Sequence, residues 1–156
     1  INNQAVAKKL ALGYNWRESS QQWFANNFID LTLGRRIFST SEDLIKWARA
    51  MNDDSLFKKE SRHLMTQNYL SEITKDFAYG YGWVIIAPGS EVKMGNMNIG
   101  LPYIIHGGST EGYKSMLANI DGGKYIIAFT SNVGDRTNEM KMVTEISIIL
   151  LEINWN

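Results

Sequence analysis

The part of this sequence with the clearest chemical potential is a histidine followed closely by three glycines. Residues 106–113 read His-Gly-Gly-Ser-Thr-Glu-Gly-Tyr. Glycines in such a segment let a ligand or another backbone approach closely and leave main-chain N–H groups accessible. N–H groups of this kind can stabilise a developing oxyanion. A glycine-rich turn beside a buried histidine would have the same composition, so the octapeptide alone leaves a catalytic and a structural interpretation open.

Few other residues suggest chemistry. The second histidine, His63, lies in a segment rich in charged residues and is expected to be exposed. Two histidines without clustered carboxylates predict no metal site, and no cofactor is expected. Arg136 could bind a carboxylate, although a solvated arginine at the start of a helix is the more common situation. There is no cysteine, which excludes disulfides, thiolate metal sites and cysteine nucleophiles.

Short runs of β-branched and aromatic residues surround the octapeptide and predict an antiparallel sheet. The expected strands are residues 83–87, 103–106, 113–120 and 124–130. The sequence Asp-Gly-Gly at residues 121–123 predicts a tight hairpin turn between the last two strands, since glycine accepts a positive φ. His106 would then lie at the end of the second strand.

Helices are expected on either side of these strands. Ser39 and Thr40 are good N-cap residues. The apolar residues that follow them at helical spacing are Leu44, Trp47, Ala48 and Met51. A second short helix is expected at residues 59–70 and a C-terminal helix at residues 136–151. The chain would thus have a helical or irregular part, about residues 1–75, and a part with antiparallel strands and a C-terminal helix, about residues 76–156. The predicted fold class is α+β.

The bulk composition is that of one globular domain. The chain has 156 residues and is 44% hydrophobic, which is enough to form a core. Its 16 basic and 16 acidic side chains give a net charge of zero. A nucleic-acid partner, which requires clustered positive charge, is therefore not expected. No signal-peptide pattern opens the chain, and a start at Ile1 without methionine suggests a mature, cleaved or truncated product.

Four segments resemble, in the right order, motifs of the class C β-lactamase and penicillin-binding-protein-like family of serine hydrolases. Residues 34–44, Gly-Arg-Arg-Ile-Phe-Ser-Thr-Ser-Glu-Asp-Leu, resemble its GG-x-x-STAEDL segment. Residues 79–83, Tyr-Gly-Tyr-Gly-Trp, resemble its YGLGW. Residues 106–113 resemble its third motif, which has Lys or His, Thr or Ser, and Gly, followed by ST-x-GF. Residues 129–132, Phe-Thr-Ser-Asn, resemble its closing strand LTN.

This resemblance implies a partial β-lactamase/transpeptidase-like fold, an antiparallel sheet with flanking helices, of which the chain is the C-terminal part only. In the family, Ser-x-x-Lys supplies the nucleophile and Tyr-x-Asn supplies a proton shuttle, and both precede the segment represented here. A Ser-x-x-Lys string begins at Ser55, but it lies downstream of the STAEDL-like segment and is interpreted as coincidental. The expected parent is a β-lactamase, D-alanyl-D-alanine carboxypeptidase or esterase type of hydrolase that acts through an acyl-enzyme. The chain alone is expected to be inactive.

The resemblance also implies residues for the site. His106 matches the Lys or His of the third motif and would donate a hydrogen bond or positive charge toward the substrate, with some sensitivity to pH because imidazole titrates near neutral pH. The backbone N–H of Ser109 would be the second oxyanion donor, and Gly108 would keep the strand edge clear for substrate. Gly107 stands where the family usually has a Thr or Ser whose hydroxyl helps to bind a substrate carboxylate. That departure weakens the case for a strong β-lactamase or carboxypeptidase and leaves esterase or amidase activity open.

Two tyrosines and the expected partners complete the predictions. Tyr79 and Tyr81 would line the substrate pocket, although buried aromatic residues of a sheet would explain them equally well. The substrate would be a small-molecule or peptidoglycan-like amide or ester, and the resemblance implies a periplasmic, extracellular or membrane-associated bacterial protein. The expected macromolecular partner is the missing N-terminal half, or a second copy paired through an edge strand at residues 124–130 (Lys124 to Thr130). The alternative is a binding or scaffolding protein that kept the fold without the chemistry.

Overall fold

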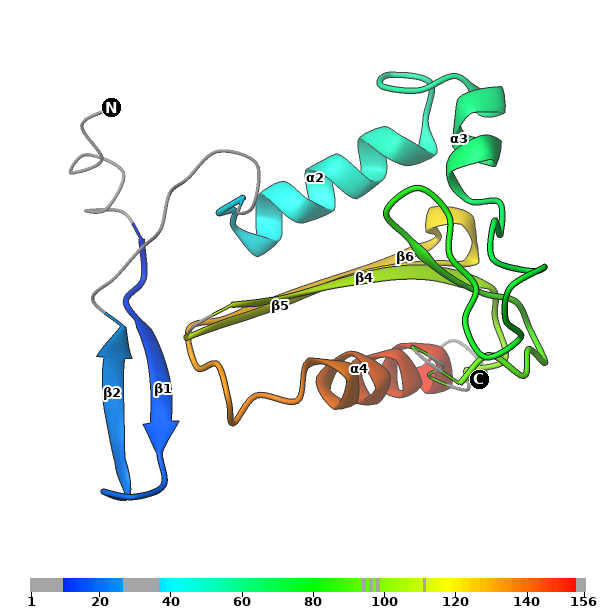
Figure 1. The fold of residues 1–156 in the computed structure, drawn as a ribbon. Helices are drawn as coiled ribbons and strands as arrows, with labels where there is room; N and C mark the ends of the chain where they lie inside the picture. The colour runs from blue at the N-terminus through cyan, green and yellow to red at the C-terminus, as the bar shows by residue number, and fades with distance from the viewer. Residues whose placement is uncertain are drawn as a thin grey trace.

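A four-stranded antiparallel sheet forms the centre of the computed structural model, which describes residues 10–26, 37–93, 95, 97, 99–110 and 112–153. Helix α2 lies across one face of this sheet and α4 across the other, while a separate two-stranded ribbon stands at one end (Figure 1). The helices and strands in chain order are β1 (Gly13–Arg17), β2 (Gln22–Asn26), α2 (Ser41–Asn52), α3 (Lys59–Met65), β3 (Val84–Ile86), β4 (Tyr103–Thr110), β5 (Tyr113–Ile120), the short 3-10 helix η1 (Asp121–Gly123), β6 (Tyr125–Ser131) and α4 (Glu139–Ile153). The predicted α+β class is confirmed.

The strands of the sheet differ in length, and this difference shapes the site. The order is β3-β4-β5-β6, and β4 and β5 pair along their whole length. The short β3 pairs with β4 only from Tyr103 to Ile105. Residues 106–110 of β4 therefore extend beyond β3, and in the described part of the chain no strand pairs with that edge of them. The sequence predicted that this strand ends at His106, but it continues to Thr110 because each of its last residues has a partner on β5.

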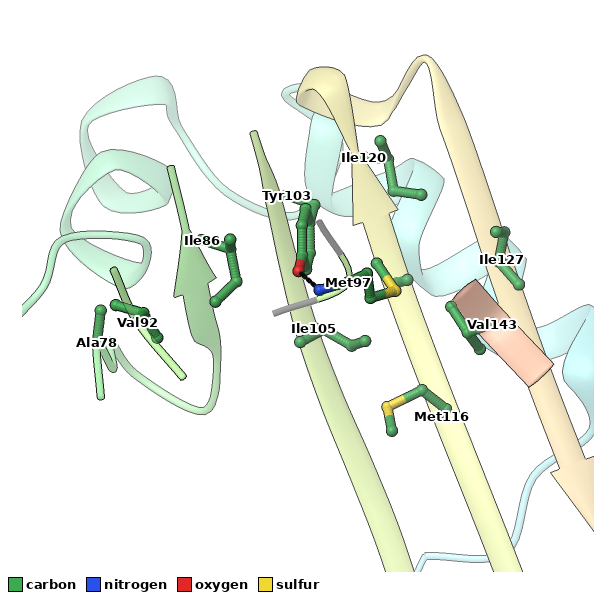
Figure 2. Close-up of a cluster of buried hydrophobic side chains, with 11 residues drawn as sticks. Ala78, Ile86, Val92, Met97, Tyr103, Ile105, Met116, Ile120, Ile127 and Val143 are labelled. Carbon is green, nitrogen blue, oxygen red and sulfur yellow. Dashed lines mark hydrogen bonds between the residues drawn. The ribbon is translucent and has the colours of Figure 1, made fainter. Parts of the chain in front are cut away.

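Residues that alternate along the strands build one core on each face of the sheet. On the α4 face, Ile105 and Ile120 are each 1% exposed and belong to one cluster with the fully buried Val143 of α4 (Figure 2). The other buried members of this cluster are Ala78, Ile86, Val92, Met97, Tyr103, Met116, Ala118 and Ile127. The first half of β4 is thus anchored in a large apolar core, and this anchors the strand whose second half is rich in glycine.

The α2 face carries a smaller cluster. Its buried members are Ala48, Met51, Trp83 and Leu117. Ile104 of β4 packs against this cluster. His106, two residues further along β4 and opposite Leu117, lies on the same face. The histidine that was singled out from the sequence is therefore on the α2 side of the sheet.

Helix α2 begins where the sequence predicts. Thr40 is the N-cap, because its Oγ1 accepts a hydrogen bond from the Asp43 N–H at 3.1 Å. Ser39, the other predicted candidate, donates its hydroxyl to the Thr40 carbonyl at 3.3 Å. Glu42 and Asp43 in the first turn place negative charge at the positive end of the helix dipole.

Replacing Thr40 by alanine is expected to lower the free energy of unfolding by about 0.5–2 kcal/mol, because one N-terminal N–H of α2 loses its acceptor. The matched change Ser39→Ala keeps that acceptor and is expected to cost clearly less. Urea denaturation of the native chain and both variants measures the two losses. Equal losses would contradict the assignment of Thr40 as the cap.

Residues 13–26 form a β-hairpin in the part of the chain for which helices and irregular structure were predicted. β1 and β2 pair along their whole length. The residues between them run from Glu18 to Gln21 and contain none of the glycine or Asn-Gly signals that usually mark a hairpin. Gln21 has a positive φ of 52°, and its side-chain amide donates to the carbonyl and the carboxylate of Glu18. Backbone bonds from the Ser20 N–H to the Arg17 carbonyl and from the Gln21 N–H to the Glu18 carbonyl also close this turn. None of its residues is a glycine, which is why the glycine pattern did not reveal it.

Two helices differ from the predicted bounds. The second helix ends early, at Met65, where the N–H and hydroxyl of Thr66 both bond to carbonyls of the last turn. The C-terminal helix begins late, at Glu139, because the Asn138 side chain accepts the Lys141 N–H at 2.9 Å and so caps it. Neither α4 nor another helix in the described residues is long and apolar enough to cross a membrane.

Candidate functional site

The candidate site is built around the edge of β4 that β3 leaves uncovered. The Asp121 N–H donates to the Pro102 carbonyl at 2.8 Å, so the backbone of Pro102 faces the β5 side. Because backbone orientation alternates along a strand, the N–H and C=O groups of the even-numbered residues of β4 also point toward β5. The backbone N–H and C=O groups of the odd-numbered residues point the other way. Those of Tyr103 and Ile105 face β3, and those of Gly107 and Ser109 face the open edge. The backbone N–H groups of these two residues are therefore available to a ligand, which is what an oxyanion site requires.

His106 and Tyr79 are in direct contact. The His106 Nε2 lies 3.0 Å from the Tyr79 hydroxyl, and the two rings are tilted by 60° with their centroids 6.2 Å apart. His106 is exposed, and this is its side-chain hydrogen bond in the described part of the chain. Both residues were assigned to the site from the sequence, but their contact was not predicted because they stand 27 positions apart.

Tyr79 is held in place from several directions. Its backbone N–H donates to the Asn68 side-chain oxygen at 3.2 Å, and its carbonyl accepts the Tyr69 N–H at 3.0 Å. Phe77 stacks on its ring, with centroids 5.4 Å apart and planes 18° apart. The phenol of Tyr79 is thus a fixed group at the site.

Tyr81, the other tyrosine predicted to line the pocket, contacts a different residue. It is 62% exposed and stacks on Tyr69, with ring centroids 4.9 Å apart. At Gly80 a β-carbon would lie 2.1 Å from the Met65 carbonyl oxygen, so glycine is needed for the chain to pass there. Desolvation, together with the neighbouring Tyr81 phenol, raises the pKa of Tyr69. The pair is an exposed aromatic surface two residues along the chain from Tyr79.

Gly108 and Ser109 lie on opposite faces of β4. Gly108 stands across from Ser115, and a β-carbon at Gly108 would lie 2.5 Å from the Ser115 hydroxyl oxygen. Packing against β5 is therefore a structural reason for glycine here, beside the predicted one of access for substrate. The Ser109 side chain lies on the α4 face, across from Lys114, whose amine forms an ion pair with Glu139 at 3.4 Å. What Ser109 presents at the open edge is its backbone, the group that its predicted role uses.

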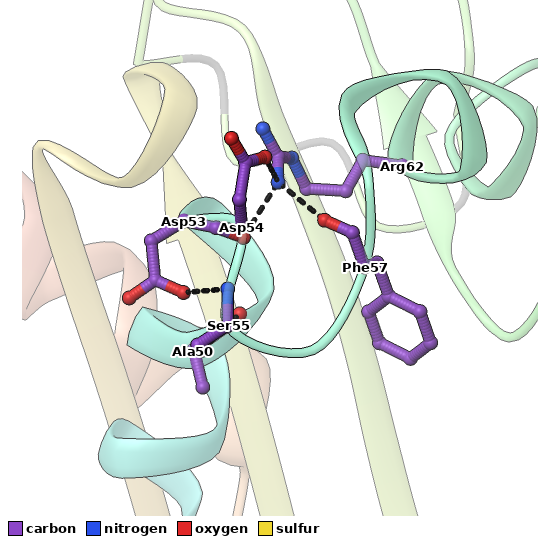
Figure 3. A network of polar contacts seen from close by, with 6 residues as sticks. All are labelled: Ala50, Asp53, Asp54, Ser55, Phe57 and Arg62. Carbon is purple, nitrogen blue, oxygen red and sulfur yellow. Dashed lines mark hydrogen bonds and ion pairs between the residues drawn. The ribbon is translucent and has the colours of Figure 1, made fainter.

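The Ser-x-x-Lys string that begins at Ser55 lies in the connection between α2 and α3 (Figure 3). The Ser55 N–H donates to Asp53 Oδ1 at 2.8 Å, and the Ser55 hydroxyl donates to the Ala50 carbonyl at 3.3 Å. Arg62 closes the loop, and its Nη1 donates to oxygens of Asp53, Asp54 and Phe57. Among the described residues the serine hydroxyl contacts no lysine, as expected if the string is coincidental.

A second string of the same spacing, which was not predicted to be of interest, runs from Ser90 to Lys93. The Ser90 hydroxyl accepts the Val92 N–H at 3.1 Å, and the Lys93 amine forms an ion pair with Asp76 at 3.0 Å. These are contacts of a surface loop, and this string is assigned no catalytic role.

Arg136 is engaged by the hairpin. Its Nη2 lies 2.5 Å from a Glu18 carboxylate oxygen, and its guanidinium carbon lies 4.9 Å from the centre of the Trp16 ring. The neighbouring Trp16 side chain and the Arg136 guanidinium both lower the pKa of Glu18. Both charged side chains are more than half exposed, so the pair contributes little to stability. The carboxylate that Arg136 binds here belongs to the chain itself.

The described residues that come together as a candidate site are therefore His106, Tyr79 and the backbone of Gly107 and Ser109. Parts of two predicted motifs, residues 34–36 and Glu111, lie outside the described residues. In the ranges that are described, no three His, Cys, Asp or Glu side chains gather as a metal site would require.

Comparison with known proteins supports the fold. No protein-family model and no curated protein matches the sequence. The structure is similar to that of an octameric penicillin-binding protein homologue from Pyrococcus abyssi, with a TM-score of 0.76 and 22% sequence identity. The match covers 96% of this chain and 33% of that one, so this chain spans about a third of the length of the homologue. The likeness shows a penicillin-binding-protein-like fold and does not single out the class C β-lactamases.

Proposed function

We propose that this chain supplies one wall of the acyl-transfer site of a penicillin-recognising serine hydrolase whose nucleophile lies outside residues 1–156. The observation that carries the proposal is the meeting of His106 with the open backbone edge of Gly107 and Ser109, in a penicillin-binding-protein-like fold. The enzyme would be of the β-lactamase, D-alanyl-D-alanine carboxypeptidase or esterase type and would act through an acyl-enzyme.

The residues of this chain would stabilise charge and position the substrate. When a serine hydroxyl attacks the substrate carbonyl, negative charge develops on the carbonyl oxygen. The backbone N–H of Ser109 would be one donor to that oxygen, and the nucleophile's own N–H would be the other. His106 would donate a hydrogen bond or a positive charge toward the substrate from the adjacent strand position.

Gly107 bears on the class of substrate. It lacks the hydroxyl that would help to bind a substrate carboxylate, and a β-carbon there would lie 3.1 Å from the methyl group of Met116 across the strand pair. The absence of that hydroxyl weakens the case for strong activity on substrates that carry such a carboxylate, β-lactams and D-alanyl peptides among them, and leaves esters and other amides open.

Residues 1–156 alone are expected to hydrolyse neither nitrocefin nor p-nitrophenyl acetate, because the chain lacks the nucleophile and the lysine that would activate it. Spectrophotometric assays of the purified chain, run beside Ser55→Ala, measure this. Turnover that disappears in Ser55→Ala would contradict both the proposed location of the nucleophile and the structural role given to Ser55.

Glycine at position 107, in place of the usual Thr or Ser, is also compatible with the second candidate function, that of a binding or scaffolding relative without chemistry. The discriminating observation is the upstream sequence of the parent gene. A Ser-x-x-Lys followed by Tyr-x-Asn supports the hydrolase, whereas a parent without them supports the non-catalytic relative.

A further inference from the structure

The hydrogen bond between Tyr79 and His106 points to a specific role for the tyrosine. We propose that Tyr79 is a positioning residue, whose phenol O–H donates to Nε2 of His106 and so holds the neutral imidazole in the tautomer that carries its proton on Nδ1. The consequence for catalysis rests on the proposed function, but the tautomer itself does not.

The chemistry of the two groups sets the direction of this hydrogen bond. Neutral imidazole has one N–H donor and one bare nitrogen acceptor, and the hydrogen bond made by one nitrogen decides which of the two is protonated. The phenol O–H is the more acidic of the two donors, and the bare imidazole nitrogen is a better acceptor than the phenol oxygen. The contact of 3.0 Å is therefore best satisfied with the phenol as the donor.

Tyr79 is suited to this role because its own position does not depend on the histidine. Asn68 and Tyr69 hold its backbone, and Phe77 stacks on its ring. His106, in contrast, is exposed and has no other side-chain hydrogen bond among the described residues. A fixed phenol thus orients a ring that could otherwise turn about both of its side-chain torsions.

The tautomer decides what the ring offers to a substrate. With Nε2 engaged by Tyr79, the Nδ1–H is the one donor of the neutral imidazole. This donor belongs to the residue of β4 that comes just before the open edge of Gly107 and Ser109. His106 can then act as a hydrogen-bond donor at the site without carrying a charge.

Histidine NMR of the 156-residue chain tests the proposal. The sequence contains two histidines, and the exposed His63 on α3 serves as an internal reference for His106. At about pH 9, where an ordinary imidazole is neutral, nitrogen-15 labelling of histidine distinguishes the protonated from the bare nitrogen of each ring. Magic-angle spinning serves equally well for an oligomeric sample. We expect mainly the Nδ1–H form at His106 and mainly the Nε2–H form, which an unconstrained imidazole prefers, at His63.

Tyr79→Phe removes only the hydroxyl and is expected to change the tautomer ratio of His106 by roughly two- to tenfold toward that of His63. Tyr81→Phe is the matched control. Tyr81 lies two positions after Tyr79 and its ring stacks on Tyr69, so removing its hydroxyl should not change the ratio at His106. A native His106 that carries its proton on Nε2, or a ratio unaffected by Tyr79→Phe, overturns the proposal whatever activity is found. The two proposals can fail separately. If His106 has the Nδ1–H tautomer but the parent hydrolyses neither esters nor β-lactams, the role of Tyr79 is supported and the proposed function is wrong.

Discussion

Replacing His106 by alanine in the intact parent protein is expected to lower kcat/KM for its best substrate by roughly one to three orders of magnitude. Removal of one aimed donor at an oxyanion-type site typically costs about 2.7–4 kcal/mol of transition-state stabilisation. The fold is expected to survive, since the ring is exposed and its hydrogen bond in the described residues goes to one partner, Tyr79. Steady-state kinetics measure the loss of activity, and thermal unfolding tests the fold.

Two further variants separate catalysis from structure. His63→Ala removes the other histidine, which is exposed on α3, and should leave both the kinetics and Tm unchanged. His106→Lys should recover part of the loss, because lysine is the other residue of the family motif that residues 106–113 resemble. Native kinetics in His106→Ala would remove this residue from the site. A loss of activity matched by a lower Tm would assign it a structural role instead.

Local signals were enough to predict the elements that rely on them. β5 has the predicted bounds, because its run of apolar residues ends at a turn where Gly122 and Gly123 take the positive φ values of 64° and 97°. The start of α2 was predicted because a cap acts within one turn, from Thr40 to Asp43. β3 and β6 lie within one residue of the predicted bounds at each end.

Features set by tertiary contacts were not predictable in the same way. The end of β4 contains Gly107 and Gly108, which have low strand propensity, yet it remains a strand because β5 pairs with it. The residues of the candidate site were predicted individually through the motif resemblance. Their arrangement required the structure, because the contact of Tyr79 with His106 and the stack of Tyr81 on Tyr69 depend on how separate segments pack.

The outer edge of β6, the last strand of the sheet, has backbone groups that could pair with another chain. Within the described residues, β6 has one neighbouring strand, β5. By the alternation that also orders β4, the backbone groups of Ile126, Ala128 and Thr130 point outward. At Asn132 the outward carbonyl is already taken, by the Tyr14 N–H at 2.8 Å. The three residues before it form an edge of the kind that pairs with other chains.

Exposed apolar side chains on α4 add to the surface that association could bury. Met142, Ile146 and Ile149 follow one another at helical spacing and are 42%, 36% and 57% exposed. An exposed apolar stripe of this kind usually marks a contact with another element or chain. The open strand edge and this helix stripe thus both favour association.

The 156-residue chain is therefore expected to bind the N-terminal half of its parent, to self-associate through residues 124–130, or to exchange strands with a second copy. Light scattering of the purified chain at tens of micromolar should give the mass of a dimer or a larger species. Thr130→Pro removes an outward N–H without removing a hydrogen bond to β5, so it should weaken self-association, whereas Thr130→Val keeps that N–H and should not. A monodisperse native monomer would contradict the prediction and would mean that the sheet closes in another way. Equal masses for the two variants would show that the chains meet through a surface other than the β6 edge.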